Sequence, residues 1–346
     1  MMEKILVTGG TGYIGSHTAV ELIESGYDVI IADNLSNSNI EVLDGIQQIT
    51  GTRPGFEQID LCYRELVFKL FEKYAGIKAI IHFAAYKAVG ESVEKPLDYY
   101  HNNLASLINL LYAMQKFNQP GLVFSSSCTV YGQPDILPVT ESAPIKQALS
   151  PYGNTKQISE EIIADTIAAI KNLKAISLRY FNPVGAHKSG LIGELPLGVP
   201  LNLVPFVTQT VAGIRDKLKV FGNDYNTPDG SAVRDYINVT DLAKAHVVAV
   251  QRLLNNKNKT RYEVFNLGTG NGVSVLEIIG AFEKATGEKV PYEIVGRRAG
   301  DIEKVWADTS FANKELGWKA ATSLEETLAS AWKWETYIRS KMKNKA

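Results

Sequence analysis

The chain has 346 residues, of which 45% are apolar and 21% are charged, and its formal net charge is -1. These values are typical of a globular protein long enough for a large core and two lobes, and they exclude a disordered or fibrous chain. Because acidic and basic residues nearly cancel, no basic field exists to hold nucleic acid or an anionic membrane, and an anionic ligand would need local positive groups.

The sequence also indicates a cellular location. Its two cysteines, Cys62 and Cys128, lie far apart and have no partner at a metal-ligand spacing. The first residues run directly into a strand-like apolar segment, without the basic start and cleavage site of a signal peptide. No run of about 18 apolar residues occurs, so no membrane span is predicted. We expect a reduced, cytoplasmic protein with no metal site.

Short β-rich runs alternate with amphipathic stretches in the first half of the chain. Strands are predicted at residues 5–8, 29–32, 79–83, 122–126 and 175–180. This alternation predicts an α/β fold over residues 1–180, built on a Rossmann-type, doubly wound parallel sheet with helices on both faces.

From Phe181 onward, glycines and prolines crowd an irregular segment. We expect a smaller α/β substrate-binding lobe over residues 181–346, from which some segments can return to the first domain. Its predicted elements are helices near 203–214, 240–254, 274–286 and 323–341 and a strand at 264–267, with Asp241 and Ser274 at or near helix N-termini.

The glycine motif after the first strand indicates a dinucleotide site. Gly9, Gly12 and Gly15 fall where the strand turns into a helix, in the run TGGTGYIG. Glycine lets the backbone approach a pyrophosphate, which the N–H groups of a helix N-terminus can bind. Alone, such a motif often marks only a turn. Here strand, motif, helix and a second strand ending in Asp33 occur in the required order.

Asp33 bears on the choice of dinucleotide. A carboxylate at the end of the second strand accepts hydrogen bonds from a ribose 2′-OH and repels a 2′-phosphate, which favours NAD over NADP. The alternative is that Asp33 is a helix cap or turn residue, for which the Asp33-Asn34 pair is also suited.

Tyr152 and Lys156 are one helical turn apart after Pro151, so their side chains project from one face. The run Ser125-Ser126-Ser127 ends the preceding predicted strand and can bring a hydroxyl beside them. On its own, a Tyr-x-x-x-Lys match is more often a pair of surface residues without a catalytic role. With the nucleotide site it indicates acid/base chemistry, for which the tyrosine pKa of about 10 must fall by about 3 units near cations.

Together these motifs resemble the extended short-chain dehydrogenase/reductase superfamily and, within it, the UDP-glucose 4-epimerase family. The similarity covers almost the whole chain. It rests on GGTGYIGSH from Gly9, KAVGES from Lys87, SSSCTVYG from Ser125, PYGNTK from Pro151, RYFNPVGA from Arg179, FGNDY from Phe221, VRDYI from Val233 and RRAGD from Arg297. The glycine and tyrosine motifs mark only the superfamily, and the later ones mark the epimerases. The departures are Ala85, where glycine is frequent, and Val305.

The resemblance implies that Tyr152 is the acid/base, that Lys156 holds the nicotinamide ribose and lowers the tyrosine pKa, and that Ser127 hydrogen-bonds the reacting hydroxyl. It also implies NAD as cofactor. The implied NAD-binding residues are Gly9, Gly12, Tyr13, Ile14, Gly15, Asp33, Asn34, Leu35, Ser36, Asn37, Ser38, Asp60, Leu61, Phe83, Ala84, Ala85, Lys87, Asn102, Ser127, Tyr152, Lys156 and Phe181. The alternative role for Asn102 is to satisfy buried backbone groups.

The implied substrate is a UDP-sugar, and the implied assembly is a homodimer. The implied substrate-binding residues are Lys87, Ser127, Tyr152, Asn182, Asn202, Leu203, Lys219, Phe221, Arg234, Tyr236, Arg298, Asp301 and Val305. In this set Arg234 and Arg298 would clamp the diphosphate. The alternative for Arg234-Asp235 is a surface ion pair.

The implied reaction inverts carbon 4 of a UDP-hexose through a 4-keto intermediate, interconverting UDP-glucose and UDP-galactose. In the family, a large tyrosine at the position of Val305 restricts the sugar pocket and a small residue opens it. Valine therefore predicts activity on UDP-N-acetylglucosamine and UDP-N-acetylgalactosamine as well. The alternative is that Val305 only packs in a β-like segment.

The sequence bears on four rival functions. A 4,6-dehydratase usually carries an Asp-Glu pair after the serine-rich strand, where this chain has Cys128-Thr129, and a UDP-glucuronate decarboxylase would also want a carboxylate there. A 4-epimerase specific for N-acetylated or uronic acid sugars stays open. A non-catalytic NAD-sensing regulator would typically have lost Tyr152 or Lys156, and both are present.

Overall fold

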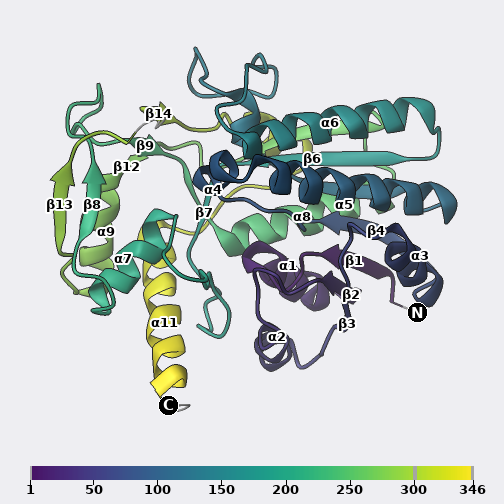
Figure 1. Cartoon of the computed structure of the whole chain (residues 1–346), viewed down its shortest axis with the longest axis horizontal. Helices are drawn as coiled ribbons and strands as arrows, with labels where there is room; N and C mark the ends of the chain where they lie inside the picture. Colours follow the sequence, from purple (N-terminus) through teal and green to yellow (C-terminus); the bar gives the residue numbers. More distant parts are fainter. Residues whose placement is uncertain (1, 299–301, 344–346) are drawn as a thin grey trace.

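The computed structural model describes residues 2–298 and 302–343. Seven parallel strands form the central sheet of the larger part of the molecule (Figure 1). In spatial order they are β11 (Tyr262–Leu267), β6 (Lys174–Tyr180), β5 (Gly121–Ser127), β4 (Ile77–His82), β1 (Lys4–Thr8), β2 (Asp28–Asp33) and β3 (Gly55–Gln58). The predicted doubly wound α/β fold is confirmed, and every predicted strand is present with slightly different ends.

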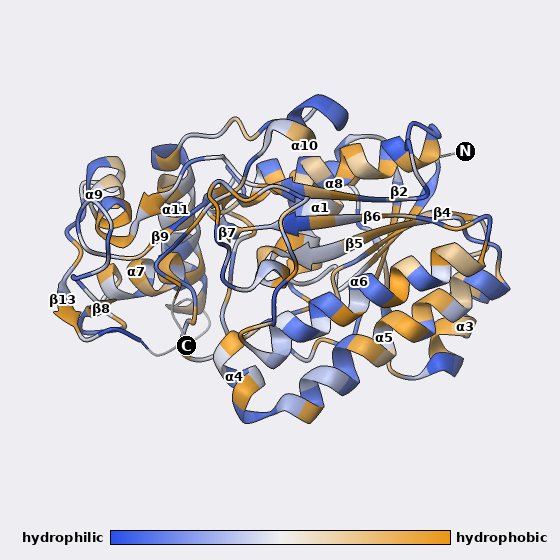
Figure 2. Cartoon of the chain, turned by 90° about the horizontal axis from the view of Figure 1, so that it is seen from above, coloured by the Kyte–Doolittle hydropathy of each residue, from blue (hydrophilic) through white to orange (hydrophobic). Residues whose placement is uncertain are grey.

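Helices cover both faces of this sheet, as Figure 2 shows. Over one face lie α1 (Tyr13–Glu24), α2 (Val42–Thr50), α8 (Val239–Leu254) and α10 (Ser310–Glu315). Over the other lie α3 (Arg64–Lys73), α5 (Pro96–Lys116) and α6 (Pro151–Ala169), with the short α4 (Val89–Glu94) beside α5 and α6. Because both faces are covered, the strands are apolar throughout; Ile5, Leu6 and Val7 are all fully buried.

The strand order reverses between β1 and β4, which opens a crevice at the carboxyl ends of these two strands. Gly9 follows β1 and Phe83 follows β4, and the backbone N–H of Phe83 donates to the Thr8 carbonyl at 3.0 Å. The expected cofactor and catalytic residues follow the carboxyl ends of the parallel strands. The fold therefore gathers them at one edge of the sheet.

In the described part of the chain, the smaller lobe is made of two short strand pairs, a three-stranded sheet and three helices around a core of its own. Its strands are β7 (Asn182–Val184) with β10 (Tyr236–Asn238), β8 (Leu218–Phe221) with β13 (Tyr292–Val295), and β9 (Val233–Arg234) between β12 (Val273–Ser274) and β14 (Lys304–Val305). Its helices are α7 (Leu203–Val211), α9 (Val275–Thr286) and α11 (Leu324–Lys343).

Two elements of the second half of the chain belong to the larger part. Strand β11 pairs with β6 at the sheet edge, and α8 packs against α1. The division at residue 180 stays a prediction, with β11 and α8 as segments of the second range that lie in the sheet layer. Ser274 is the N-cap of α9, and Asp241 lies in the first turn of α8 behind the N-cap Asn238, so both lie at or near a helix start, as predicted. Within the described ranges, none of the helices is both long and apolar enough to cross a membrane.

Candidate active site

The turn from β1 into α1 is a cradle that requires glycine. A Cβ on Gly15 would lie 2.3 Å from the Gly9 carbonyl oxygen, and a Cβ on Gly9 would lie 2.7 Å from the backbone nitrogen of Ala84. Gly9 also has a positive φ of 69°. Gly12 is the N-cap of α1 and makes no side-chain cap bond, so the first N–H groups of the helix can bind an anion. This cradle fits a pyrophosphate.

Asp33 links the loop after β2 to the glycine turn. Its Oδ1 accepts from Leu35 N at 2.9 Å and from Ser38 Oγ at 3.2 Å, and its Oδ2 accepts from Thr11 N at 3.2 Å. Asp33 is therefore a turn residue, which was the alternative weighed above. A carboxylate offers about four acceptor sites, so it can also accept a ribose hydroxyl. The two roles are compatible at this position.

The other residues expected around NAD lie along the same edge or next to it. They are Tyr13 and Ile14 at the start of α1, Asn34, Leu35, Ser36, Asn37 and Ser38 after β2, Asp60 and Leu61 after β3, Phe83, Ala84, Ala85 and Lys87 after β4, Asn102 on α5, and Phe181 after β6. Some already have partners within the chain. The Tyr13 hydroxyl donates to the Gly185 carbonyl at 2.6 Å, and Asp60 Oδ1 accepts from Cys62 N at 2.8 Å.

Lys87 reaches across to the smaller lobe. Its Nζ lies 3.2 Å from Oε1 of Glu194, and the same oxygen accepts from Nδ2 of Asn202 at 2.7 Å. The ammonium also lies 5.8 Å from the centre of the Tyr13 ring. Glu194 therefore joins an expected cofactor residue to an expected substrate residue.

Ser127, Tyr152 and Lys156 meet at the carboxyl end of β5. Ser127 ends that strand, and its hydroxyl is hydrogen-bonded to the Tyr152 hydroxyl. Helix α6 begins at Pro151 behind Ser150, a serine N-cap followed by proline at the first helical position, which is a strong helix start. The sequence therefore fixes where α6 begins and points its first turn at Ser127.

Lys156 is buried beneath the tyrosine. Its Nζ donates to the Ser125 carbonyl at 2.7 Å and lies 4.8 Å from the centre of the Phe124 ring. The distance from Nζ to the centre of the Tyr152 ring is 5.9 Å. Burial lowers the pKa of Lys156 to about 8, and the negative charge of Glu160 opposes this shift.

Burial raises the pKa of Tyr152 to about 12, and the hydrogen bond with Ser127 opposes the shift. This is the reverse of the lowering expected from the resemblance. The residues of the chain alone therefore do not prepare a phenolate. Lowering the pKa requires positive charge closer to the phenol oxygen.

The pair β9 and β14 brings Arg234 and Val305 next to each other, as partners in a parallel register. Val305 is buried and packs in one cluster with Phe181, Tyr131 and Cys128. Burial raises the pKa of Cys128 to about 12, and Arg234 opposes this shift, which places the guanidinium within electrostatic reach of the end of β5. Two expected substrate residues thus lie near Cys128, the residue that directly follows Ser127.

Asp235, the neighbour of Arg234, is fully buried. Its carboxylate accepts hydrogen bonds from the backbone of Thr269, Gly270 and Ala307. The alternative of a surface ion pair between Arg234 and Asp235 is therefore wrong. Tyr236 follows on β10, where it pairs with Asn182 of β7.

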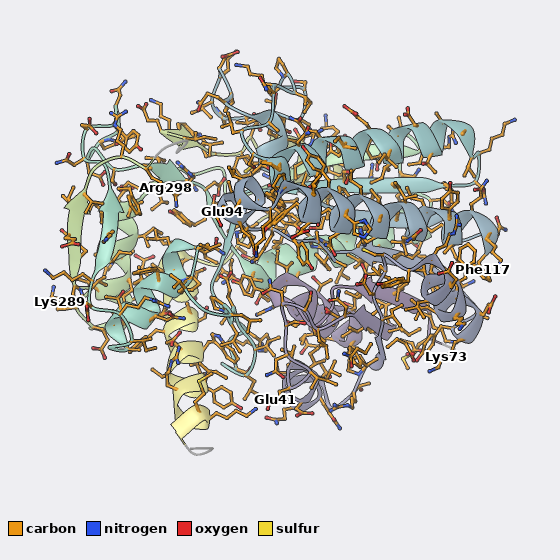
Figure 3. All side chains as sticks on the ribbon, viewed as in Figure 1. Glu41, Lys73, Glu94, Phe117, Lys289 and Arg298 are labelled. Carbon is orange, nitrogen blue, oxygen red and sulfur yellow. The ribbon has the colours of Figure 1, made fainter. Side chains whose placement is uncertain are left out.

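The remaining expected substrate residues lie in the smaller lobe. The Arg298 guanidinium lies 5.6 Å from the centre of the Phe221 ring, beyond the carboxyl ends of β8 and β13 (Figure 3). Lys219 lies two residues before Phe221 on β8 and projects from the same face. Asn202 is the N-cap of α7, and Leu203 begins that helix. Asp301 lies outside the described residues.

Comparison with known proteins identifies the family. The family model for GDP-mannose 4,6 dehydratase matches residues 6–331. The UDP-glucose 4-epimerase of Bacillus subtilis (strain 168) is 52% identical over 332 residues, which are 96% of each chain. The UDP-glucose 4-epimerase of Homo sapiens is 49% identical over 341 residues, or 97% of each chain. The crystal structure of the enzyme from Stenotrophomonas maltophila, with bound NAD and formylated UDP-arabinopyranose, has a TM-score of 0.94 and 49% identity and covers 99% of this chain and 100% of its own.

The chain belongs to the UDP-glucose 4-epimerase family. Full-length similarity to UDP-glucose 4-epimerases confirms the resemblance found in the motifs. The site agrees with this family rather than with the dehydratases. Cys128 and Thr129 directly follow Ser127 in the short 3-10 helix η1 (Cys128–Tyr131), where an elimination would use carboxylates.

Two polar residues of this epimerase site were not singled out by the motifs. Asn103 is buried and joins the Tyr86 backbone to the Thr155 hydroxyl, which ties the loop after β4 to α6. Glu160 is buried one turn after Lys156 and bonds Ser126 and Arg179. No spacing rule distinguishes either residue from ordinary helix positions, because their partners come from distant parts of the chain.

Proposed function

We propose that the chain is an NAD-dependent epimerase that inverts carbon 4 of UDP-hexoses, interconverting UDP-glucose and UDP-galactose. One observation carries the proposal: Ser127, Tyr152 and Lys156 meet at the carboxyl edge of the sheet, on the same edge as a glycine cradle that fits a pyrophosphate. The family supports it, since related structures contain NAD and UDP or a UDP-sugar.

In this reaction Tyr152 takes the proton from the 4-hydroxyl of the sugar and later returns it, with Ser127 holding the reacting oxygen. Lys156 provides positive charge below the tyrosine ring. When bound, NAD supplies the hydride acceptor and donor, so that the sugar passes through a 4-keto form and no external oxidant is consumed. The glycine cradle and Asp33 would hold the dinucleotide at its pyrophosphate and ribose.

The smaller lobe has the positive groups that a UDP group needs. Arg234 and Arg298 are proposed to bind the diphosphate through charge-assisted hydrogen bonds while the hexose turns over. Phe221, already in contact with Arg298, and Leu203 offer apolar surface for the nucleotide. Asn182 and Asn202 complete the proposed polar contacts.

We also propose a broad specificity that includes N-acetylated UDP-hexoses. The support is Val305, which lies next to Arg234 and packs against Phe181. A valine side chain is smaller than a tyrosine side chain and would restrict a bound sugar less at this position. A homodimer and a cytoplasmic location belong to the same proposal, supported by the family resemblance and by the two free cysteines.

The deciding experiment incubates the pure protein with UDP-galactose, without added NAD, and identifies the products by NMR. We expect UDP-glucose to appear until equilibrium is reached. The same incubation with UDP-N-acetylgalactosamine and with UDP-galacturonate tests the breadth. If none of the three sugars is converted, the proposal is overturned and a non-catalytic NAD-binding role is favoured.

A further inference from the structure

A buried charged network lies behind the catalytic residues. Glu160 of α6 stands one helical turn after Lys156. Its Oε1 accepts from Ser126 Oγ at 2.5 Å and from Arg179 Nε at 2.9 Å, and its Oε2 accepts from the Arg179 guanidinium. Glu160, Ser126 and Arg179 are all buried. A buried carboxylate of this kind is costly unless it is fully bonded, so its retention calls for a reason.

Each of the three serines at the end of β5 interacts with a different residue of α6. The Ser125 carbonyl accepts from Lys156, Ser126 donates to Glu160, and Ser127 bonds Tyr152. Three consecutive residues of one strand are thus each tied to a residue of α6. The three α6 residues are spaced one turn apart, so they present one continuous face to the strand end.

We propose that Glu160 is a positioning residue of the epimerase reaction: it fixes the three-serine end of β5 against α6 and supplies the negative charge that faces Lys156. This inference rests on the proposed function. Glu160 touches neither substrate nor cofactor in the proposed site. It acts through Lys156 and, by way of Ser126, through Ser127.

The network continues to the far side of the site. Arg179 Nη1 donates to the Tyr131 hydroxyl at 2.9 Å, and that hydroxyl donates to Asn266 Oδ1 at 2.7 Å. Asn266 Nδ2 donates to the Val139 carbonyl at 2.9 Å, and Val139 N donates to the Trp306 carbonyl at 2.9 Å. Trp306 follows the strand that carries Val305. Hydrogen bonds therefore connect the end of β5 to the segment with Val305 and Trp306, beside the proposed sugar pocket.

The groups around Lys156 leave Glu160 as its charged neighbour of opposite sign. On β4, burial and then Lys156 itself lower the pKa of His82 to about 3, so this imidazole is neutral. On β6, burial raises the pKa of Tyr180 far above its usual range, so this phenol is also neutral. Tyr152 on α6 is the reacting group, and Arg179 on β6 is a cation held on Glu160.

The charge of Glu160 determines the direction in which the alkaline limb of the activity should move. Burial lowers the pKa of Lys156 and Glu160 opposes the shift, so removing the carboxylate charge lowers the lysine pKa further. The uncompensated Arg179 acts in the same direction. The cationic form of Lys156 is then lost at a lower pH. The loss of activity at alkaline pH should therefore move down by about one pH unit, the size expected when one nearby charge is removed from a buried site.

The test compares Glu160→Gln with Glu161→Gln, a matched control at the next, exposed position of α6. The turnover number and KM for UDP-galactose are measured in the holoenzyme from pH 6 to pH 10. We expect the alkaline limb of kcat to shift down by about one unit in Glu160→Gln, with KM unchanged within twofold, while Glu161→Gln follows the wild type. Because Glu160→Gln removes the charge, an alkaline limb that stays at the wild-type position in this variant would show that the carboxylate does not act on Lys156 and would overturn the proposal.

Two further variants keep the test decisive if Glu160→Gln does not fold. Glu160→Asp retains the charge and withdraws it by one methylene, and Ser126→Ala removes one hydrogen bond without changing charge. Each should lower kcat at least threefold, with the alkaline limb in place and KM unchanged. Wild-type kcat in both would contradict positioning by Glu160. Wild-type protein without epimerase activity would instead contradict the proposed function.

Discussion

Val305 lies directly across from Arg234 in the parallel pairing of β14 with β9. Paired residues of adjacent strands project from the same face, so the valine borders whatever the arginine binds. An N-acetyl group at carbon 2 adds three heavy atoms that must move through this space when the sugar turns over. Val305→Tyr should therefore suppress turnover of UDP-N-acetylgalactosamine more than tenfold, about 1.4 kcal/mol, and spare UDP-galactose.

The comparison with UDP-galactose is the internal control for this variant. Val305→Ile adds one methylene and should leave both substrates nearly unaffected. Equal loss of the two activities in Val305→Tyr would show damage to the packing around Phe181 instead of a narrower pocket. A wild type inactive on N-acetylated sugars would equally contradict the argument.

Tyr152→Phe deletes the phenol oxygen and leaves the ring in place. A general acid/base contributes about a hundredfold to ten-thousandfold, so kcat should fall by that factor. Binding of NAD and UDP should be unchanged, and this is checked by calorimetric titration. Tyr131→Phe, which removes a hydroxyl outside the proposed reaction, is the matched control and should retain more turnover. Near-wild-type kcat in Tyr152→Phe would contradict the role of Tyr152 as the general acid/base.

Asp33 should make the protein prefer NAD over NADP, because its carboxylate would face the 2′-phosphate of NADP. Cofactor-free protein titrated with each dinucleotide measures the preference. Asp33→Asn keeps one oxygen, which can accept from Leu35 N, but it replaces the oxygen that accepts from Thr11 N with an NH2 group and removes the charge. It should narrow the difference between the NAD and NADP affinities mainly by improving NADP binding. Equal affinities in the wild type would leave Asp33 with the turn role alone.

Activity should fall as the pH rises through about 8, the pKa to which burial lowers Lys156. The protonated lysine carries the positive charge near Tyr152, and this charge is lost above that pH. The stability contribution has the opposite sign: the unfolded lysine still binds its proton up to 10.5, so this group favours the folded state more as the pH rises. The profile of kcat/KM against pH, with urea unfolding at pH 7 and pH 9, tests both. Rising activity above pH 8 would contradict this role of Lys156.

Asp235→Ala should destabilise the fold by about 3 kcal/mol, since it leaves the backbone donors of Thr269, Gly270 and the buried Ala307 without their buried acceptor. Urea unfolding measures the change. Asp224→Ala is the control, because Asp224 pairs with Arg297 at the exposed surface and its loss should change the stability much less. Equal effects would mean that the Asp235 bonds are not needed for stability.

The sheet and the catalytic group were predictable because their signals are local. Strand, glycine turn and helix follow one another within a few residues, and Tyr152 and Lys156 share a helix turn. The short strands β9, β12 and β14 were not predicted, since two-residue strands carry no periodicity and depend on distant partners. The rise in the pKa of Tyr152 to about 12 in the chain alone was not predictable for a related reason: burial is a property of the folded chain that spacing does not report.

Strand β11 has a consequence for how the protein is made. It pairs with β6 but lies more than eighty residues later in the chain. When β6 has just emerged from the ribosome, the outer edge of this strand therefore has no partner. Long-range parallel pairing is also slow to form. The sheet gains its last strand only after residue 267 has emerged. A fragment ending at residue 180 therefore has an unpaired strand at its edge and is prone to associate through this edge rather than to fold alone.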